Sequence, residues 1–195
     1  MKTVVPGFRA FTVSYNGRAD RIISEVKVSL AFNPTNPPSP LPEAYQTTAL
    51  WDTGATKSVI TKATADALGL IPIGTARVSH AGGTSLANTF LVNMFLPNGV
   101  AVAGIIVTEC AGIANNAGAL IGMDIISQGN FSITNFGGRT CMSFRFPSIA
   151  EIDYVKEAKE LKELSKKRVG RNDPCPCGKK DAAGKPLKYK KCCGK

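Results

Sequence analysis

The chain has 195 residues, enough for one large domain or for a medium domain with an appendage. Hydrophobic residues make up 44% and charged residues 19%, a composition that supports a packed core and argues against a wholly disordered chain. The net charge of +10 is uneven: residues 1–148 hold ten Lys/Arg and seven Asp/Glu, whereas residues 149–195 hold fourteen and seven. The basic C-terminal part predicts an acidic partner such as nucleic acid, a ribosome surface or an acidic protein, with a merely solvated tail as the alternative.

The N-terminal residues show no apolar segment followed by a small-residue cleavage site, and no stretch approaches the roughly 18 apolar residues of a membrane helix. We therefore expect a cytoplasmic protein with no membrane contact. Two of the six cysteines, Cys110 and Cys141, are isolated in apolar stretches and are expected to be small core residues. The other four cluster at the C-terminus, a pattern more typical of metal binding than of a disulfide framework.

Alternating apolar and β-branched residues predict an all-β domain over residues 1–147. Asn16-Gly17 permits a tight hairpin between its first two strands. The proline-rich segment 33–42 is expected to be a stiff connection, because proline has no amide hydrogen for a sheet. A short helix is expected at 61–70, where Thr61 can cap its start. The other expected segments, in chain order, are strands 8–15, 21–32 and 44–51, a hairpin at 76–96 with its tip at Ala81, Gly82 and Gly83, strand 100–109, the loop 111–119, the segment 120–126, and a hairpin at 130–146.

After Pro147 the sequence changes character. Residues 148–168 are rich in helix formers and contain no glycine or proline, and their apolar residues fall on one half of a helical wheel. This pattern predicts a helical linker over 148–169, followed by a small cysteine-containing segment over 170–195.

The stretch "LWDTGATKSVI", residues 50–60, places an acid between two apolar segments. Glycine directly after Asp52 and Thr53 allows the backbone to approach its neighbours closely. About 70 residues later, Leu120-Ile121-Gly122 follows the glycine-tipped hairpin. This order resembles the retropepsin-like aspartic peptidases of bacterial type over roughly residues 20–147, which have a DTG loop, a flap, and an apolar-apolar-Gly segment beneath the active loop.

The resemblance implies a closed acid-protease β-barrel and an aspartic endopeptidase that acts on peptide or protein substrates. It makes Asp52 the catalytic acid, Thr53 a loop-locking hydroxyl and Gly54 the close-approach residue. It also makes Ala81, Gly82 and Gly83 the substrate-binding flap tip, and Leu120, Ile121 and Gly122 the supporting loop.

This chemistry uses two carboxylates that share a proton and activate a water molecule between them. The chain has one DTG, so the second carboxylate must come from a second copy, and we expect a homodimer with Asp52 on the two-fold axis. Trp51 stands where aliphatic residues are commoner in the family, and strand alternation places it on the core side. His80, beside the flap, and Asp124, after the supporting glycine, are given no role.

The C-terminal cysteines form two close pairs, Cys175/Cys177 and Cys192/Cys193. Four thiolates can complete a tetrahedral zinc shell, and a metal would stabilise a segment too short to have its own core. Residues 170–194 are similar to the SEC-C zinc motif, with "DAAGKP" standing as an extra insertion between the pairs. The resemblance implies structural Zn²⁺, no cofactor for catalysis, and a tail that docks on a protein, ribosome or nucleic-acid partner.

The sequence thus predicts an all-β, retropepsin-like barrel, then a linker helix and a small zinc-bound tail. Two alternatives stay open. One is a peptide-binding or scaffold protein on the same fold; the other is a nucleic-acid or ribosome-associated factor that acts through its basic tail. The sequence leaves substrate and cleavage specificity open.

Overall fold

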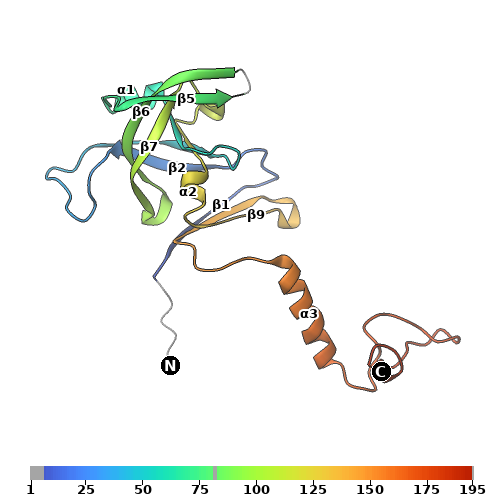
Figure 1. Ribbon diagram of the computed structural model, residues 1–195. Coiled ribbons are helices and arrows are strands. Elements are labelled where there is room, and N and C mark those ends of the chain that lie inside the picture. Colours follow the sequence, from blue (N-terminus) through green and yellow to red (C-terminus); the bar gives the residue numbers. More distant parts are fainter. Residues whose placement is uncertain (1–6, 81–82, 195) are drawn as a thin grey trace. The chain divides into compact units, whose positions relative to one another are not determined.

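The computed structural model describes residues 7–80 and 83–194, and the chain divides into two compact units, Met1–Ala150 and Glu151–Lys195 (Figure 1). Strands dominate the first unit: β1 (Arg9–Ser14), β2 (Ile23–Leu30), β3 (Ala44–Trp51), β4 (Val59–Thr61), β5 (Gly74–His80), β6 (Gly83–Phe95), β7 (Ala101–Cys110), β8 (Ala119–Ile121), β9 (Asn130–Thr134) and β10 (Cys141–Phe146). Its α-helices are α1 (Lys62–Ala67) and α2 (Met123–Ile126), and 3-10 turns occupy Pro97–Gly99, Ala114–Asn116 and Phe136–Gly138.

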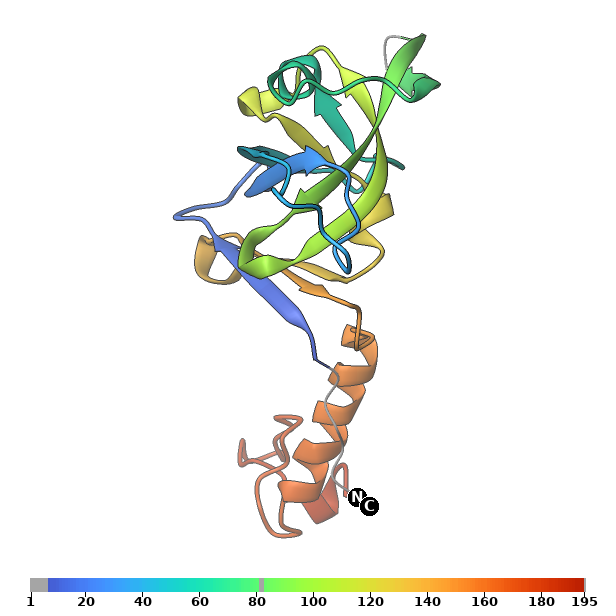
Figure 2. The ribbon, with the colours of Figure 1, turned by 90° about the vertical axis from the view of Figure 1, so that its left-hand side faces the viewer.

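Six strands of the larger sheet close on themselves. They hydrogen-bond in the order β2-β3-β8-β4-β7-β6, and β6 pairs again with β2, which completes a ring. Within residues 7–80 and 83–194, strand β5 pairs with β6 alone, outside the ring. The hairpin that β5 forms with the first part of β6 extends from one end of the barrel, as Figures 1 and 2 show. The predicted closed acid-protease barrel is confirmed.

A second sheet contains β1, β10 and β9. Strand β1 is antiparallel to β10, with Phe11 opposite Phe144, and β2 pairs with β3 and β6 instead. The expected hairpin between the first two strands is therefore wrong. Residues 16–17 do form a bend, but a turn fixes only a change of direction, whereas the partner of β1 is set by the side chains that its apolar face buries.

That apolar face meets the barrel in an aromatic cluster. The Trp51 and Phe131 rings stack with centroids 5.3 Å apart and planes at 4°, and the Phe144 ring lies 5.1 Å from Trp51 in a tilted arrangement. The Trp51 indole also donates a hydrogen bond from Nε1 to Ser24 Oγ at 2.9 Å. The prediction that Trp51 faces the core is confirmed, and its indole N–H is satisfied there.

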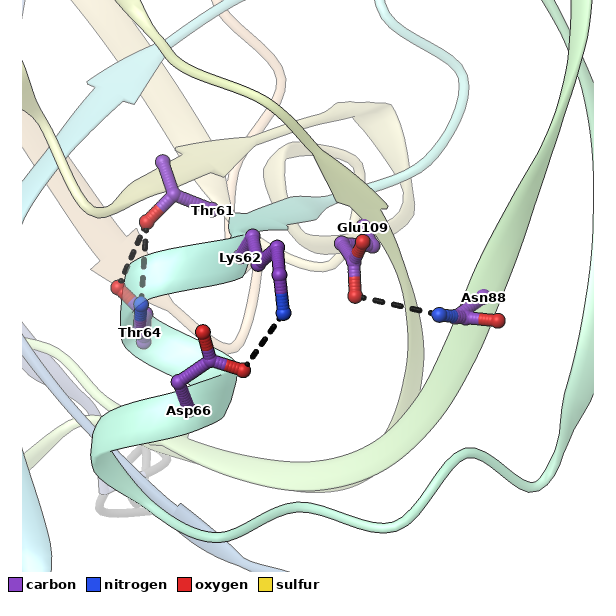
Figure 3. Close-up of polar contacts among 6 residues, drawn as sticks. All are labelled: Thr61, Lys62, Thr64, Asp66, Asn88 and Glu109. Atoms are coloured by element: carbon purple, nitrogen blue, oxygen red, sulfur yellow. Dashed lines mark hydrogen bonds and ion pairs between the residues drawn. The ribbon is translucent and has the colours of Figure 1, made fainter.

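Helix α1 follows β4 directly and is capped as predicted. The Thr61 hydroxyl accepts a hydrogen bond from the Thr64 backbone N–H at 3.2 Å (Figure 3). The Thr64 hydroxyl in turn donates to the Gly118 carbonyl at 2.9 Å, which attaches the helix to the loop before β8. Strand β4 has three residues and the sequence analysis missed it, because so short a segment shows no alternation.

Cys110 and Cys141 are half-buried, so the expectation that both are core residues is only partly met. Burial nevertheless raises the pKa of the Cys110 thiol above its usual range. Among the residues that the structure describes, no helix is long and apolar enough to cross a membrane.

The second unit begins with α3 (Tyr154–Arg168). This helix starts six residues later than the predicted 148. Asp153 caps it, accepting hydrogen bonds at Oδ1 from the N–H groups of Val155 and Lys156. The rest of the unit consists of turns, two isolated β-bridges and a 3-10 turn at Tyr189–Lys191.

We expect Phe144→Ala to lower the free energy of unfolding by about 3–5 kcal/mol, because Phe144 is fully buried in the aromatic cluster. The control is Phe136→Ala, which removes a ring that is 95% exposed and should change stability by less than about 0.5 kcal/mol. Denaturant unfolding followed by tryptophan fluorescence measures both. Equal losses in the two variants would contradict the assignment of the core.

Candidate active site and cysteine cluster

Strand β3 delivers Asp52 to the start of the loop 52–58. The Asp52 backbone N–H donates to the Ile121 carbonyl at 3.0 Å, and β3 runs parallel to β8 with Trp51 opposite Ile121. The Asp52 side chain is half-buried, while Thr53 and Gly54 are exposed. The sequence-predicted acid therefore lies directly after the buried end of β3, where the chain returns to the surface.

The loop turns back on the Asp52 carboxylate. The Gly54 backbone N–H donates to Asp52 Oδ1 at 2.8 Å, and the Ala55 N–H donates to the Asp52 carbonyl at 3.3 Å. A Cβ atom at Gly54 would lie 3.2 Å from Asp52 Oδ1, tighter than ordinary contact. Glycine at this position therefore lets a backbone amide reach the carboxylate, as the sequence led us to expect.

The segment Leu120-Ile121-Gly122 lies directly beside this loop. Gly122 is buried, and a Cβ on it would come within 2.6 Å of the Lys57 carbonyl carbon and oxygen and 2.9 Å of the Ala55 carbonyl oxygen. The next residue, Met123, donates its N–H to the Ala55 carbonyl at 2.8 Å. Two segments some 65 residues apart in sequence thus touch backbone to backbone.

The hairpin of β5 and β6 occupies the place of the predicted flap, with His80 opposite Gly83 at its last described pair. Gly83 has φ +118°, a region that favours glycine. Ala81, Gly82 and the side chain of His80 lie outside the described residues. At the base of the hairpin, Asn88 donates to Glu109 Oε2 of β7 at 3.3 Å, which ties β6 to the barrel (Figure 3).

The four C-terminal cysteines come together in the second unit. All four sulfur atoms lie within 4.8 Å of one another, and Cys177 Sγ is 3.3 Å from the sulfurs of both Cys175 and Cys192. A tetrahedral zinc ion with Zn–S bonds of about 2.3 Å holds its sulfurs about 3.8 Å apart, so the cluster has the size of such a site. The predicted grouping of these cysteines into one possible metal site is confirmed.

Backbone turns bring the sulfurs together. The Cys175 N–H donates to the Leu187 carbonyl at 2.7 Å, and Gly178, with φ +73°, donates its N–H back to the Cys175 carbonyl at 3.1 Å. The inserted residues form a closed turn in which Asp181 Oδ1 accepts from the N–H groups of Ala183 and Lys185. The insertion therefore leaves the sulfur cluster intact.

The sulfurs do not ionise alike. A hydrogen bond from the Cys177 backbone N–H lowers the pKa of Cys175 to about 6, whereas the Cys177 sulfur raises the pKa of Cys192 to about 12. Hydrogen bonds among the sulfurs and from the backbone set this difference, and repulsion from the Cys175 thiolate adds to the rise at Cys192. A bound divalent cation would offset that repulsion, and four thiolates are the donor set that zinc prefers.

Comparison with known proteins agrees with both sites. Residues 43–128 match the family described as "gag-polyprotein putative aspartyl protease". The protein translocase subunit SecA of Maridesulfovibrio salexigens is 62% identical over 46 residues, which cover 24% of this chain and 5% of SecA. That of Thermodesulfovibrio yellowstonii is 69% identical over 29 residues, 15% of this chain and 3% of SecA. The chain thus spans only a small part of the SecA relatives it matches, a stretch about the size of the second unit.

Solved structures with a similar course of the chain include a retropepsin-like aspartic protease from Rickettsia conorii, with a TM-score of 0.44 and 15% identity over 72% of this chain and 96% of that one. Another is the EIAV protease in complex with an inhibitor, with a TM-score of 0.40 and 19% identity over 59% and 92%. Both TM-scores lie below 0.5, so likeness to an aspartic protease rests on the match over residues 43–128 and on the geometry of the loop 52–58.

Gly122→Ala should destabilise the first unit by about 1–3 kcal/mol and displace the loop 52–58, because the added methyl group overlaps backbone atoms that cannot rotate away. Gly112→Ala is the matched control, since a Cβ there meets nothing within 4 Å. Thermal unfolding of both variants gives the comparison. If Gly122→Ala is as stable as the control, the backbone contact is not tight.

The match over residues 43–128, the closed ring of strands and the DTG loop seated on Gly122 together support a retropepsin-like aspartic protease domain in the first unit, and the cysteine cluster with the SecA matches fits a zinc motif of the SEC-C type in the second.

Proposed function

We propose that the protein is an aspartic-type endopeptidase that is active as a homodimer. The observation that carries the proposal is the geometry of the loop 52–58. Asp52 is half-buried at the start of this loop, and backbone contacts with Ile121, Gly122 and Met123 hold the loop in place. Family membership supports the same activity.

A second carboxylate is needed, and three other acids of this unit have partners of their own. Asp124 accepts hydrogen bonds from Ser58, Asp66 pairs with Lys62, and Glu109 bonds Asn88. The sequence has one DTG. A second copy related by a two-fold axis would place its own Asp52 opposite the first, so that two chains build one active site.

In such a dyad, two carboxylates about 3 Å apart share one proton. The charged carboxylate takes a proton from the bound water while the water oxygen attacks the peptide carbonyl carbon. The protonated carboxyl group gives its proton to the carbonyl oxygen. The carboxyl group that took the proton from water then protonates the nitrogen as the C–N bond breaks, and one hydroxyl of the intermediate returns its proton to the other carboxylate as the new carboxyl group forms. An extended peptide would lie along the hairpin of β5 and β6, whose tip, Ala81, Gly82 and Gly83, would close over it.

In the second unit, Cys175, Cys177, Cys192 and Cys193 would hold a structural Zn²⁺. The ion would cross-link two ends of a segment that has few buried residues of its own. Exposed lysines at 179, 180, 185, 188 and 191 surround the cluster or lie close to it in sequence. We infer that this tail docks the enzyme on an acidic protein, ribosome or nucleic-acid surface in the cytoplasm, where thiols stay reduced.

Replacing Asp52 by Asn should lower kcat/KM on an unfolded protein substrate by about 10⁴-fold, because the amide cannot act as general base. Asp20→Asn, which changes an exposed acid 32 residues before Asp52 in the sequence, should leave activity unchanged. The decisive sample is a mixed dimer of wild type and Asp52→Asn, purified by two different tags. It should be inactive, since both carboxylates are required.

A mixed dimer with half of the wild-type activity would contradict the shared dyad. Should wild-type protein cleave nothing between about pH 4 and about pH 7, the peptide-binding alternative replaces the enzyme.

Purified protein should contain one zinc per chain, and Cys192→Ser should reduce this below one half while Cys110→Ser leaves it unchanged, because Cys192 lies in the sulfur cluster and Cys110 in the first unit. Elemental analysis measures the metal, and a strong chelator should make residues 170–195 sensitive to protease. Zinc that stays bound in Cys192→Ser would overturn the ligand assignment.

A further inference from the structure

Asp124 is the acid for which the sequence gives no role. It lies in the first turn of α2, two residues after the supporting Gly122, and is half-buried. Its carboxylate points at Ser58, the last residue of the loop that begins with Asp52.

Both carboxylate oxygens of Asp124 are used on that one residue. Oδ2 accepts the Ser58 backbone N–H at 3.0 Å, and Oδ1 accepts the Ser58 hydroxyl at 2.7 Å. Such a two-point contact fixes both the position and the rotation of Ser58, and hydrogen bonds to a charged acceptor are stronger than those between neutral groups.

The hydroxyl also has a fixed direction. Ser58 Oγ accepts the Gly122 N–H at 3.1 Å, so its single hydrogen is free to point at Asp124. The side chain of Ser58 is fully buried, and water therefore has no access to replace a lost partner. The hydrogen bonds run from Gly122 to Ser58 and from Ser58 to Asp124, so Ser58 is held by two residues of the segment 122–124.

The loop 52–58 is thus attached to residues 121–124 at three points: at its start by Asp52 N–H to the Ile121 carbonyl, in its middle by the Ala55 carbonyl to Met123 N–H, and at its end by Ser58 to Gly122 and Asp124. The first two contacts join backbone groups, and their close approach requires glycine at 122. The third depends on two side chains and fixes the end of the loop.

We infer that Asp124 is a positioning residue for Asp52, acting through Ser58 to hold the active loop in its working geometry. The inference rests on the proposed peptidase function for its catalytic consequence, but its structural part can be measured without any substrate.

The test variant is Asp124→Asn, which keeps the shape and replaces one acceptor oxygen by an NH₂ donor. One of the two Ser58 donors then faces another donor, so one bond is lost. The matched control is Asp66→Asn on α1, where the acid is exposed and pairs with Lys62 at 2.9 Å on the outer surface (Figure 3). Ser58→Ala is the second variant, because it removes the hydroxyl and keeps the backbone bond to Asp124.

Full-length variants are compared by amide hydrogen exchange and by steady-state kinetics on an unfolded protein substrate. In Asp124→Asn we expect exchange over residues 52–58 to rise roughly tenfold while β2 and β7 keep their protection. We expect kcat to fall about 10- to 100-fold with KM within about twofold of wild type, because substrate still binds but the dyad is misaligned. Ser58→Ala should change both in the same direction, and Asp66→Asn should change neither.

Unchanged exchange over 52–58 in Asp124→Asn overturns the inference, as does a rise spread evenly over the barrel, which would mark a general loss of stability. If Asp124→Asn does not fold, Ser58→Ala decides by the same two criteria. If wild-type protein has no activity, the proposed function fails, and exchange over 52–58 still decides whether Asp124 holds the loop.

Discussion

The structure of the first unit depends on one close contact between two backbones. Gly122 lies so near Lys57 and Ala55 that a methyl group has no room, and this closeness lets Met123 and Ser58 reach across. Three strands of the barrel meet at this contact. Strand β3 leads into the loop 52–58, β4 leads out of it, and β8 pairs with both. Backbone contacts, rather than a flexible side chain, therefore set the position of Asp52.

Local patterns in the sequence predicted the parts of this arrangement that depend on residue type alone. Gly54 and the Thr61 cap behave as expected because each is governed by neighbours within three residues. The partner of β1 was not predicted, since Asn16-Gly17 encodes a bend while the choice of β10 comes from Phe11 packing against residues far along the chain. The bond between Ser58 and Asp124 was missed for the same reason: serine and aspartate are common, and nothing at either position marks a partner 66 residues away.

The two units solve the problem of stability differently. The first has a continuous apolar interior that includes the stacked ring of Trp51 and the fully buried Phe144. In the second, Cys175 is the buried residue of the cysteine cluster and most side chains face solvent. A short, lysine-rich segment cannot hold its shape by burial alone, and shared ligation of one ion is an efficient way to fix distant turns. The four sulfurs lie close enough together for one ion to bind them all.

Strand β5 forms ladder bonds on one side only, while the ring is completed by β2 and β6 without it. The hairpin of β5 and β6 can therefore bend without breaking hydrogen bonds between the strands that form the ring. The base of this hairpin lies where Asn88 donates a hydrogen bond to Glu109, several residues along β6 from the hairpin end. The closed ring of strands that holds the loop 52–58 is thus separate from the hairpin that extends beyond it.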